Sequence, residues 1–256
     1  MKKKRKILIT AVTVLCCVIA AASVIKAIPA EYENITVPVY YNTDSNQTTY
    51  NREKVREYAR FACTDPDNGT FRYLDRSNGD TATDCANFVS QCIYAGGYPM
   101  TDEWYMKKYS DKVPKIRRIL DKITGKAAMI WHDYTGKADT YGEYTEMNYL
   151  WTYPWTCAGV QSQYGENYFF GDHYTVSDYS SLKKIVLDNN IQTGDVIYQG
   201  TDKHHVMIIT NVDEDGTLYI SSHNPVLYDH KLDEVFWEKG GFGGTCQLYK
   251  VKDRIE

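Results

Sequence analysis

The sequence has little positive charge beyond its N-terminus. Six of its 29 lysines and arginines precede residue 27, and the other 23 face 33 aspartates and glutamates, which gives that part of the chain a net charge of −10. An acidic chain does not use bulk charge to bind nucleic acid, anionic polymers or lipid head groups. We therefore predict no nucleic-acid partner, and any attraction to an anionic surface must come from specific contacts.

The sequence also lacks internal repeats, low-complexity segments and a metal-ligand spacing. His204 and His205 are adjacent, but neighbouring side chains on a strand point to opposite faces and cannot readily bind one metal ion. His132, His173 and His230 have no supporting context. We therefore predict no metal and no organic cofactor.

The N-terminus combines basic and apolar residues in the order that an export signal or a membrane anchor requires. Five basic residues, 2–6, precede an uncharged run of 19 residues, 7–25. A signal peptidase could cut after Ala22, whereas Leu15 before Cys16 is not the small residue that a lipoprotein signal needs. The basic end of an anchor stays inside the cell, so we predict that the rest of the chain is extracytoplasmic.

The remainder of the chain divides into a short linker and one domain. We predict a signal peptide or membrane anchor over residues 1–30, a polar linker over 31–48 and one domain over 49–256, which is large enough to bury a core. The chain would contact a membrane only through its N-terminal segment, and we expect a monomer.

A cysteine lies at the predicted start of an apolar helix. Residues 85–95 contain no helix breaker, and the glycines at 96–97 end the helix. Thr83 or Asp84 can cap its start. The first turn of a helix carries unpaired N–H groups and roughly half a positive charge, which favour a thiolate. This position makes Cys85 a candidate nucleophile.

A histidine heads the first strand of a predicted hairpin. The hairpin comprises an apolar strand over 205–210, a loop centred on 214–215 and a second strand over 217–222. That register places His205 opposite Asn224, and directly opposed residues share a face of the sheet. A slip of one residue would place His223 there instead.

Cys85 and His205 follow the chain order of the papain-like cysteine hydrolases. The segment from Asp84 to Cys92, with the glycines at 96–97, more closely resembles the bacterial family known as the putative amidase domain. Three further segments are similar to that family: residues 50–52, 194–196 and 205–210. The likeness covers residues 48–250.

This resemblance implies a papain-like α+β fold, in which N-terminal helices pack on an antiparallel β-sheet and the nucleophilic cysteine lies at a helix start. It also implies hydrolysis of an amide bond, and the expected substrate is a cell-wall (peptidoglycan) peptide. Two alternatives stay open: a catalytically weak, surface-displayed module that binds the wall, and an acyl transferase that uses the same thioester chemistry.

The pattern and the resemblance together assign candidate roles. Cys85 would attack the amide carbonyl, and His205 would take the thiol proton and later deliver one to the leaving amine. Asn224 would orient the imidazole, with His223 as the alternate third residue. His204 would point to the opposite face of the strand.

The block from residue 131 to residue 179 is rich in tryptophan and tyrosine and shows little periodicity. Flat aromatic rings stack well on sugars and line peptide grooves. Trp151 and Trp155 are therefore candidates for lining the substrate cleft, because the family also has aromatic residues between its Cys and His segments. The alternative is that these rings fill the core.

The remaining predicted elements are packing elements. They are a helix over 52–62 capped by Asn51, a helix with the inward stripe Val113, Ile116, Leu120 and Ile123 that ends at Gly125, a helix over 181–189, and a terminal strand over 245–250.

Five cysteines follow the N-terminal segment: Cys63, Cys85, Cys92, Cys157 and Cys246. In an oxidising compartment an odd number leaves at least one thiol unpaired. We expect Cys85 to be that thiol. The other four could form two disulfides or remain buried thiols.

Overall fold

The computed structural model describes residues 32–33, 47–66, 71–74, 84–121, 123, 143–146, 149–236 and 244–255. The chain divides into two compact units, residues 1–34 with 107–150, and residues 35–106 with 151–256. Within the described ranges no helix is long and apolar enough to cross a membrane. The predicted signal or anchor lies outside the described residues.

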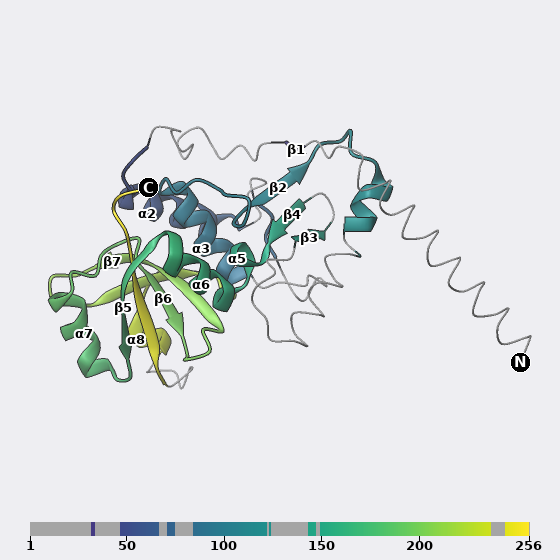
Figure 1. The fold of residues 1–256 in the computed structure, drawn as a ribbon. Helices are drawn as coiled ribbons and strands as arrows, with labels where there is room; N and C mark the ends of the chain where they lie inside the picture. The colour runs from purple at the N-terminus through teal and green to yellow at the C-terminus, as the bar shows by residue number, and fades with distance from the viewer. Residues whose placement is uncertain are drawn as a thin grey trace, which may run out of the picture. The chain divides into compact units, whose positions relative to one another are not determined.

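The larger unit contains a six-stranded antiparallel sheet, part of which is labelled in Figure 1. Its strand order is β5-β10-β6-β7-β8-β9. Its strands are β5 (Phe170–Val176), β6 (Val196–Gln199), β7 (His205–Val212), β8 (Leu218–Ser222), β9 (Leu227–Lys231) and β10 (Cys246–Val251). The predicted terminal strand is confirmed as β10, which lies between β5 and β6 inside the sheet.

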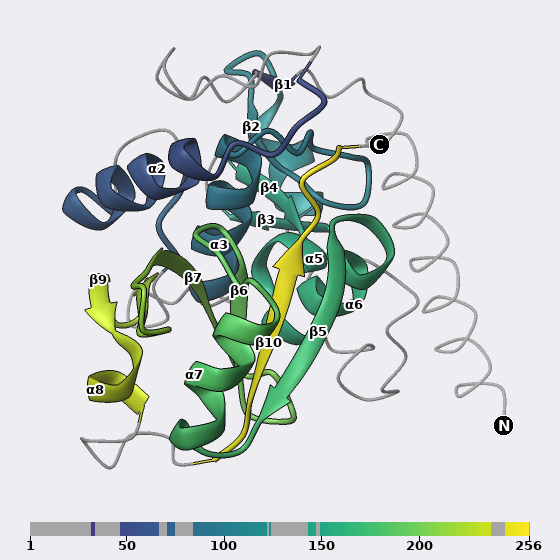
Figure 2. The ribbon, with the colours of Figure 1, turned by 90° about the vertical axis from the view of Figure 1, so that its left-hand side faces the viewer.

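Helices pack on this sheet, as Figure 2 shows. They are α2 (Arg52–Thr64), α3 (Asp84–Ala95), α6 (Ala158–Tyr168), α7 (Tyr179–Asp188) and α8 (Leu232–Phe236), while the short helix α5 (Tyr153–Thr156) packs against α3 and α6. An apolar cluster joins α7 to one face of the sheet through Ile197, Met207 and Ile209. The expected α+β arrangement of N-terminal helices on an antiparallel sheet is confirmed.

The helix α3 ends where the sequence predicts. Ala95 is its last residue, and Gly97 adopts a φ of 121°, a conformation that favours glycine. The Gly97 N–H donates to the Tyr94 carbonyl at 2.9 Å and so closes the last turn. A Cβ at Gly96 would lie 2.3 Å from the ring of Tyr50. The first glycine therefore allows close packing, and the second allows the chain to turn.

The hairpin of β7 and β8 has the predicted register at its inner end. Ile209 lies opposite Ile220, as a loop centred on 214–215 requires. A bulge then shifts the pairing by one residue, so Asn211 lies opposite Tyr219. The extra residue bends the strand near its turn and leaves the inner register unchanged.

Two of the family-like segments meet at one point. The Arg52 guanidinium donates to the buried Asp195 carboxylate at 2.8 Å, and the Tyr50 hydroxyl donates to the Gly194 carbonyl at 3.0 Å. Asp195 also accepts the N–H of Val251 at 2.9 Å. These residues tie the start of α2, the start of β6 and the end of β10 together, which is a structural role.

The smaller unit carries most of a second sheet with the order β1-β2-β4-β3. Its strands are β1 (Tyr32–Glu33), β2 (Met106–Tyr109), β3 (Glu143–Glu146) and β4 (Tyr149–Thr152). Two residues of the segment predicted as a linker thus form β1.

The helix at 115–121 of the smaller unit does not present the predicted stripe inward. Val113 is buried, but Ile116 and Ile123 are 52% and 60% exposed. The expectation of an inward apolar stripe is therefore wrong, because polar groups hold this helix: the Tyr109 hydroxyl donates to the buried Asp121 carboxylate at 2.8 Å. The predicted end at Gly125 lies outside the described residues.

Candidate active site

Cys85 is the second residue of α3, and its side chain is 2% exposed. The helix packs against β7. Because β7 and β8 are antiparallel, the start of β7 lies beside the end of β8, and the first residue of α3 contacts the segment that follows β8. The start of α3, the start of β7 and the end of β8 therefore converge at one end of the sheet.

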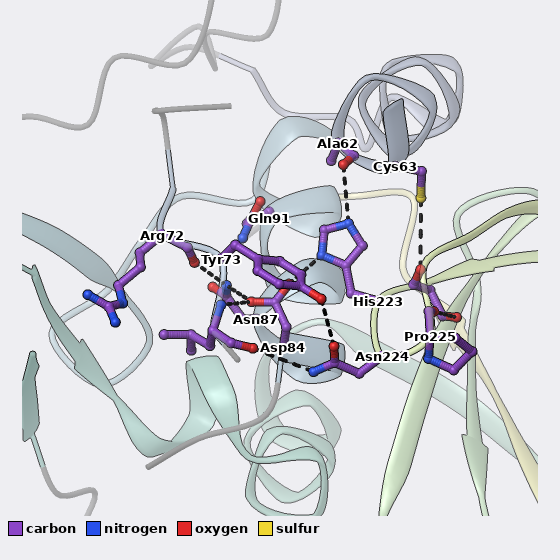
Figure 3. A network of polar contacts seen from close by, with 12 residues as sticks. Ala62, Cys63, Arg72, Tyr73, Asp84, Asn87, Gln91, His223, Asn224 and Pro225 are labelled. Atoms are coloured by element: carbon purple, nitrogen blue, oxygen red, sulfur yellow. Dashed lines mark hydrogen bonds and ion pairs between the residues drawn. The ribbon is translucent and has the colours of Figure 1, made fainter. Parts of the chain in front are cut away.

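Asp84, immediately before Cys85, is fully buried and has three hydrogen-bonding partners (Figure 3). Its carboxylate accepts the Leu74 N–H at 2.6 Å and the Asn87 side-chain amide at 2.7 Å, and it also pairs with Nδ1 of His223. Burial raises the pKa of the Asp84 carboxyl, and the hydrogen bond from His223 opposes that rise. These bonds fix the first turn of α3 to two other segments.

His223 is 1% exposed, and its ring stacks on Phe88 with the centroids 4.2 Å apart. Its Nδ1 faces the Asp84 carboxylate, and its Nε2 lies 3.3 Å from the carbonyl oxygen of Ala62, near the C-terminal end of α2. A helix C-terminus favours a nearby positive charge. Both ring nitrogens face acceptors, so neither is placed to accept a proton from Cys85.

His205 is the first residue of β7 and lies opposite Gln199. Burial lowers its pKa to about 4, and the neighbouring His204 adds to that effect. The imidazole is therefore neutral at neutral pH. Successive side chains of a strand point to opposite faces of the sheet. Because Met207 and Ile209 pack with α7, regular alternation would place the His205 side chain on the α7 face as well. The pairing of His205 with Cys85 is accordingly argued below as a proposal.

Asn224 lies beyond the end of β8, where the chain leaves the ladder with a φ of 59° at this residue. Its side chain accepts the Tyr73 hydroxyl at 2.8 Å and lies 3.5 Å from the carbonyl of Leu74. Leu74 is also a partner of Asp84. Asn224 thus joins the same network as the start of α3 (Figure 3), and simple alternation does not hold at this end of the sheet.

The first turn of α3 is also held from the opposite side. The Tyr198 hydroxyl donates to Oε1 of Gln161 at 2.9 Å, and Nε2 of Gln161 donates to the Ala86 carbonyl at 2.8 Å and to the Ser90 hydroxyl at 2.6 Å. All four residues are fully buried. Sequence reasoning missed Tyr198, Gln161 and the role of Asp84, for which it offered only a cap.

Trp151 and Trp155 do not line a cleft. Both side chains are completely buried, and Nε1 of Trp155 donates to Oδ1 of Asn87 at 2.7 Å. The Trp155 ring also packs against Trp104, with the centroids 4.7 Å apart. The expectation that they contact substrate is corrected: both rings fill the core, and Trp155 also supports α3.

No disulfide joins the five cysteines that the structure describes. Burial raises the pKa of the Cys63 and Cys246 thiols to about 12, and it raises that of Cys92 well above its usual value. These three thiols are therefore poor nucleophiles at neutral pH.

A model of the putative amidase domain family matches residues 49–243. The chain belongs to the putative amidase domain family. No curated protein and no solved structure matches it. Membership implies a hydrolase that acts on amide bonds, and the matched range contains Cys85, both predicted hairpin strands and every residue of the Asp84–His223 network.

Proposed function

We propose that this member of the putative amidase domain family is a cysteine-dependent amidase or peptidase that acts outside the cytoplasm on cell-wall peptides. The observation that carries the proposal is a buried thiol in the first turn of α3, held from both sides by buried hydrogen bonds. A rigid first turn presents its N–H groups in fixed directions, which suits a thiolate and a developing oxyanion.

The proposed reaction begins with proton transfer from the Cys85 thiol to His205. The sulfur attacks the amide carbonyl, a tetrahedral oxyanion forms, and the imidazolium donates its proton to the leaving amine. Water then hydrolyses the thioester and restores the thiol. The backbone N–H of Cys85 would donate to the oxyanion, and loss of one such donor typically costs about 3 kcal/mol.

Burial lowers the pKa of His205 to about 4, so the imidazole is neutral at neutral pH, which is the protonation state that a general base needs. The thiol and the histidine come from elements that meet at one end of the sheet. Their pairing requires the His205 side chain to depart from the regular alternation of β7 and to turn from the α7 face toward α3. Asn224, two residues past β8, is the proposed orienting residue, and its bonds to Tyr73 and Leu74 place it on the side of α3. His223 instead supports Asp84, so we propose a positioning role for it.

The test is mass spectrometry of muropeptides incubated with the full chain. Hydrolysis yields fragments whose summed mass exceeds the parent by one water, whereas acyl transfer joins two peptides without that gain. We expect hydrolysis that disappears in Cys85→Ala. Unchanged muropeptides, or equal cleavage by Cys85→Ala, would refute the proposal.

A further inference from the structure

The helix at 115–121 exposes an apolar face. Ile116, Ile119 and Ile123 are 52%, 54% and 60% exposed, and their spacing of three and four residues places them on one side of a helix. Four large apolar side chains are more than half exposed in the described part of the chain, and three of them are these isoleucines. An ordinary surface helix turns such residues toward the core.

The opposite face of this helix is held by polar contacts. Nε of Arg117 donates to the Asp121 carboxylate at 2.8 Å, and the same carboxylate accepts the Tyr109 hydroxyl. Nη2 of Arg118 donates to the Ser110 carbonyl at 3.0 Å. The bonds of Asp121 and Arg118 join the helix to residues 109–110 without using the isoleucines.

The exposed isoleucines lie within a strongly basic segment. Residues 107–123 contain seven lysines and arginines and two acidic residues, a net charge of +5 in a chain whose net charge is −4. Lys112 and Lys115 are exposed. An apolar stripe bordered by cations is the pattern of a helix that lies in the plane of an anionic membrane surface.

We infer that the face formed by Ile116, Ile119 and Ile123 binds the surface of an anionic lipid bilayer. The isoleucine side chains enter the boundary between head groups and acyl chains, and Lys112 and Lys115 contact lipid phosphates. A nucleic acid or a soluble polyanion would satisfy the charges but would leave the apolar stripe in water. Only a bilayer contacts both the positive charges and the apolar face of the isoleucines.

The experiment places a tryptophan in the stripe of the full chain and measures its quenching by lipids with brominated acyl chains. Ile119→Trp is compared with Leu187→Trp, because Leu187 on α7 is equally exposed, at 53%, and lies outside the basic segment. The emission of the five native tryptophans is subtracted with the wild-type chain. Vesicles are phosphatidylcholine alone, or phosphatidylcholine with about one third phosphatidylglycerol.

We expect the extra emission of Ile119→Trp to fall by more than about half in the anionic vesicles only, and that of Leu187→Trp to stay unchanged. Adding Lys115→Glu, or raising the salt to about 0.5 M, should restore most of the emission. Equal quenching of both variants would mean that the N-terminal segment alone brings the whole protein close to the bilayer. That result would overturn the inference. Quenching that does not depend on lipid charge, or a spectral change with soluble polyphosphate alone, would overturn it as well.

Discussion

The pair of Asp84 and His223 permits a quantitative test of what holds the start of α3. Both side chains are almost fully buried, at 0% and 1% exposure. Removing one member of a buried ion pair typically costs about 3–5 kcal/mol, because the other member stays buried without its partner. We expect His223→Ala to cost about 3 kcal/mol, since the Asp84 carboxylate keeps its bonds to Leu74 and Asn87.

Asp84→Ala should cost more, about 5 kcal/mol, because it leaves three buried donors without an acceptor. The double variant should cost little more than Asp84→Ala alone, which gives a coupling energy of about 2–3 kcal/mol. Asp84→Asn should cost only about 1 kcal/mol. Its oxygen can still accept from Leu74 and Asn87, and its amide can still hydrogen-bond to Nδ1 of His223.

The assay is urea unfolding of the full chain at neutral pH, followed by tryptophan fluorescence. His204→Ala is the matched control, because its contact with Asp202 is largely exposed and should contribute little to stability. Strict additivity of the two single variants, or an Asp84→Asn variant as unstable as Asp84→Ala, would refute the reasoning.

Further predictions concern chemistry, pH and packing. Cys85→Ala should lower amide hydrolysis by about 10³-fold or more with almost unchanged stability, and a loss below tenfold would exclude Cys85 as the nucleophile. In a short iodoacetamide pulse at neutral pH, peptide mapping should find Cys85 labelled before Cys63 and Cys246, whose pKa is about 12. Burial lowers the pKa of His205 to about 4 while the unfolded chain keeps about 6.5, so stability should fall by about 2–3 kcal/mol as pH falls from 6.5 to 4. Urea unfolding of His205→Gln should lack that part of the pH dependence. Gly96→Ala should destabilise by about 1–3 kcal/mol through its clash with the neighbouring tyrosine ring, and thermal unfolding would detect it.

Local sequence signals predicted the elements of the fold well. The cap at Asn51, whose side chain accepts the Lys54 N–H at 3.0 Å, begins α2 as expected. The glycines after Ala95 end α3, and the acidic turn joins β7 and β8 into the expected hairpin, although its inner register also depends on the bulge. Each of these signals acts over a few residues, so sequence alone can show it.

The contacts that shape the candidate site are not local. Asp84 and His223 are 139 residues apart, and nothing near either residue indicates the other. For the helix at 115–121, the sequence predicts the element but not its orientation. Its periodicity was correctly identified as helical, but periodicity alone does not tell which face meets the core. The burial of Trp155 likewise depends on Asn87, which is 68 residues away.

The position of β10 bears on where this domain can be cut. The family match stops at residue 243, yet β10 spans Cys246–Val251 and pairs with β5 on one side and with β6 on the other. A chain shortened to the matched range would lose an interior strand and expose two strand edges, which invite pairing between molecules. It would also lose the Val251 N–H that Asp195 accepts. The cooperative folding unit therefore extends past the boundary that sequence similarity marks, and a soluble fragment should keep the chain through Val251.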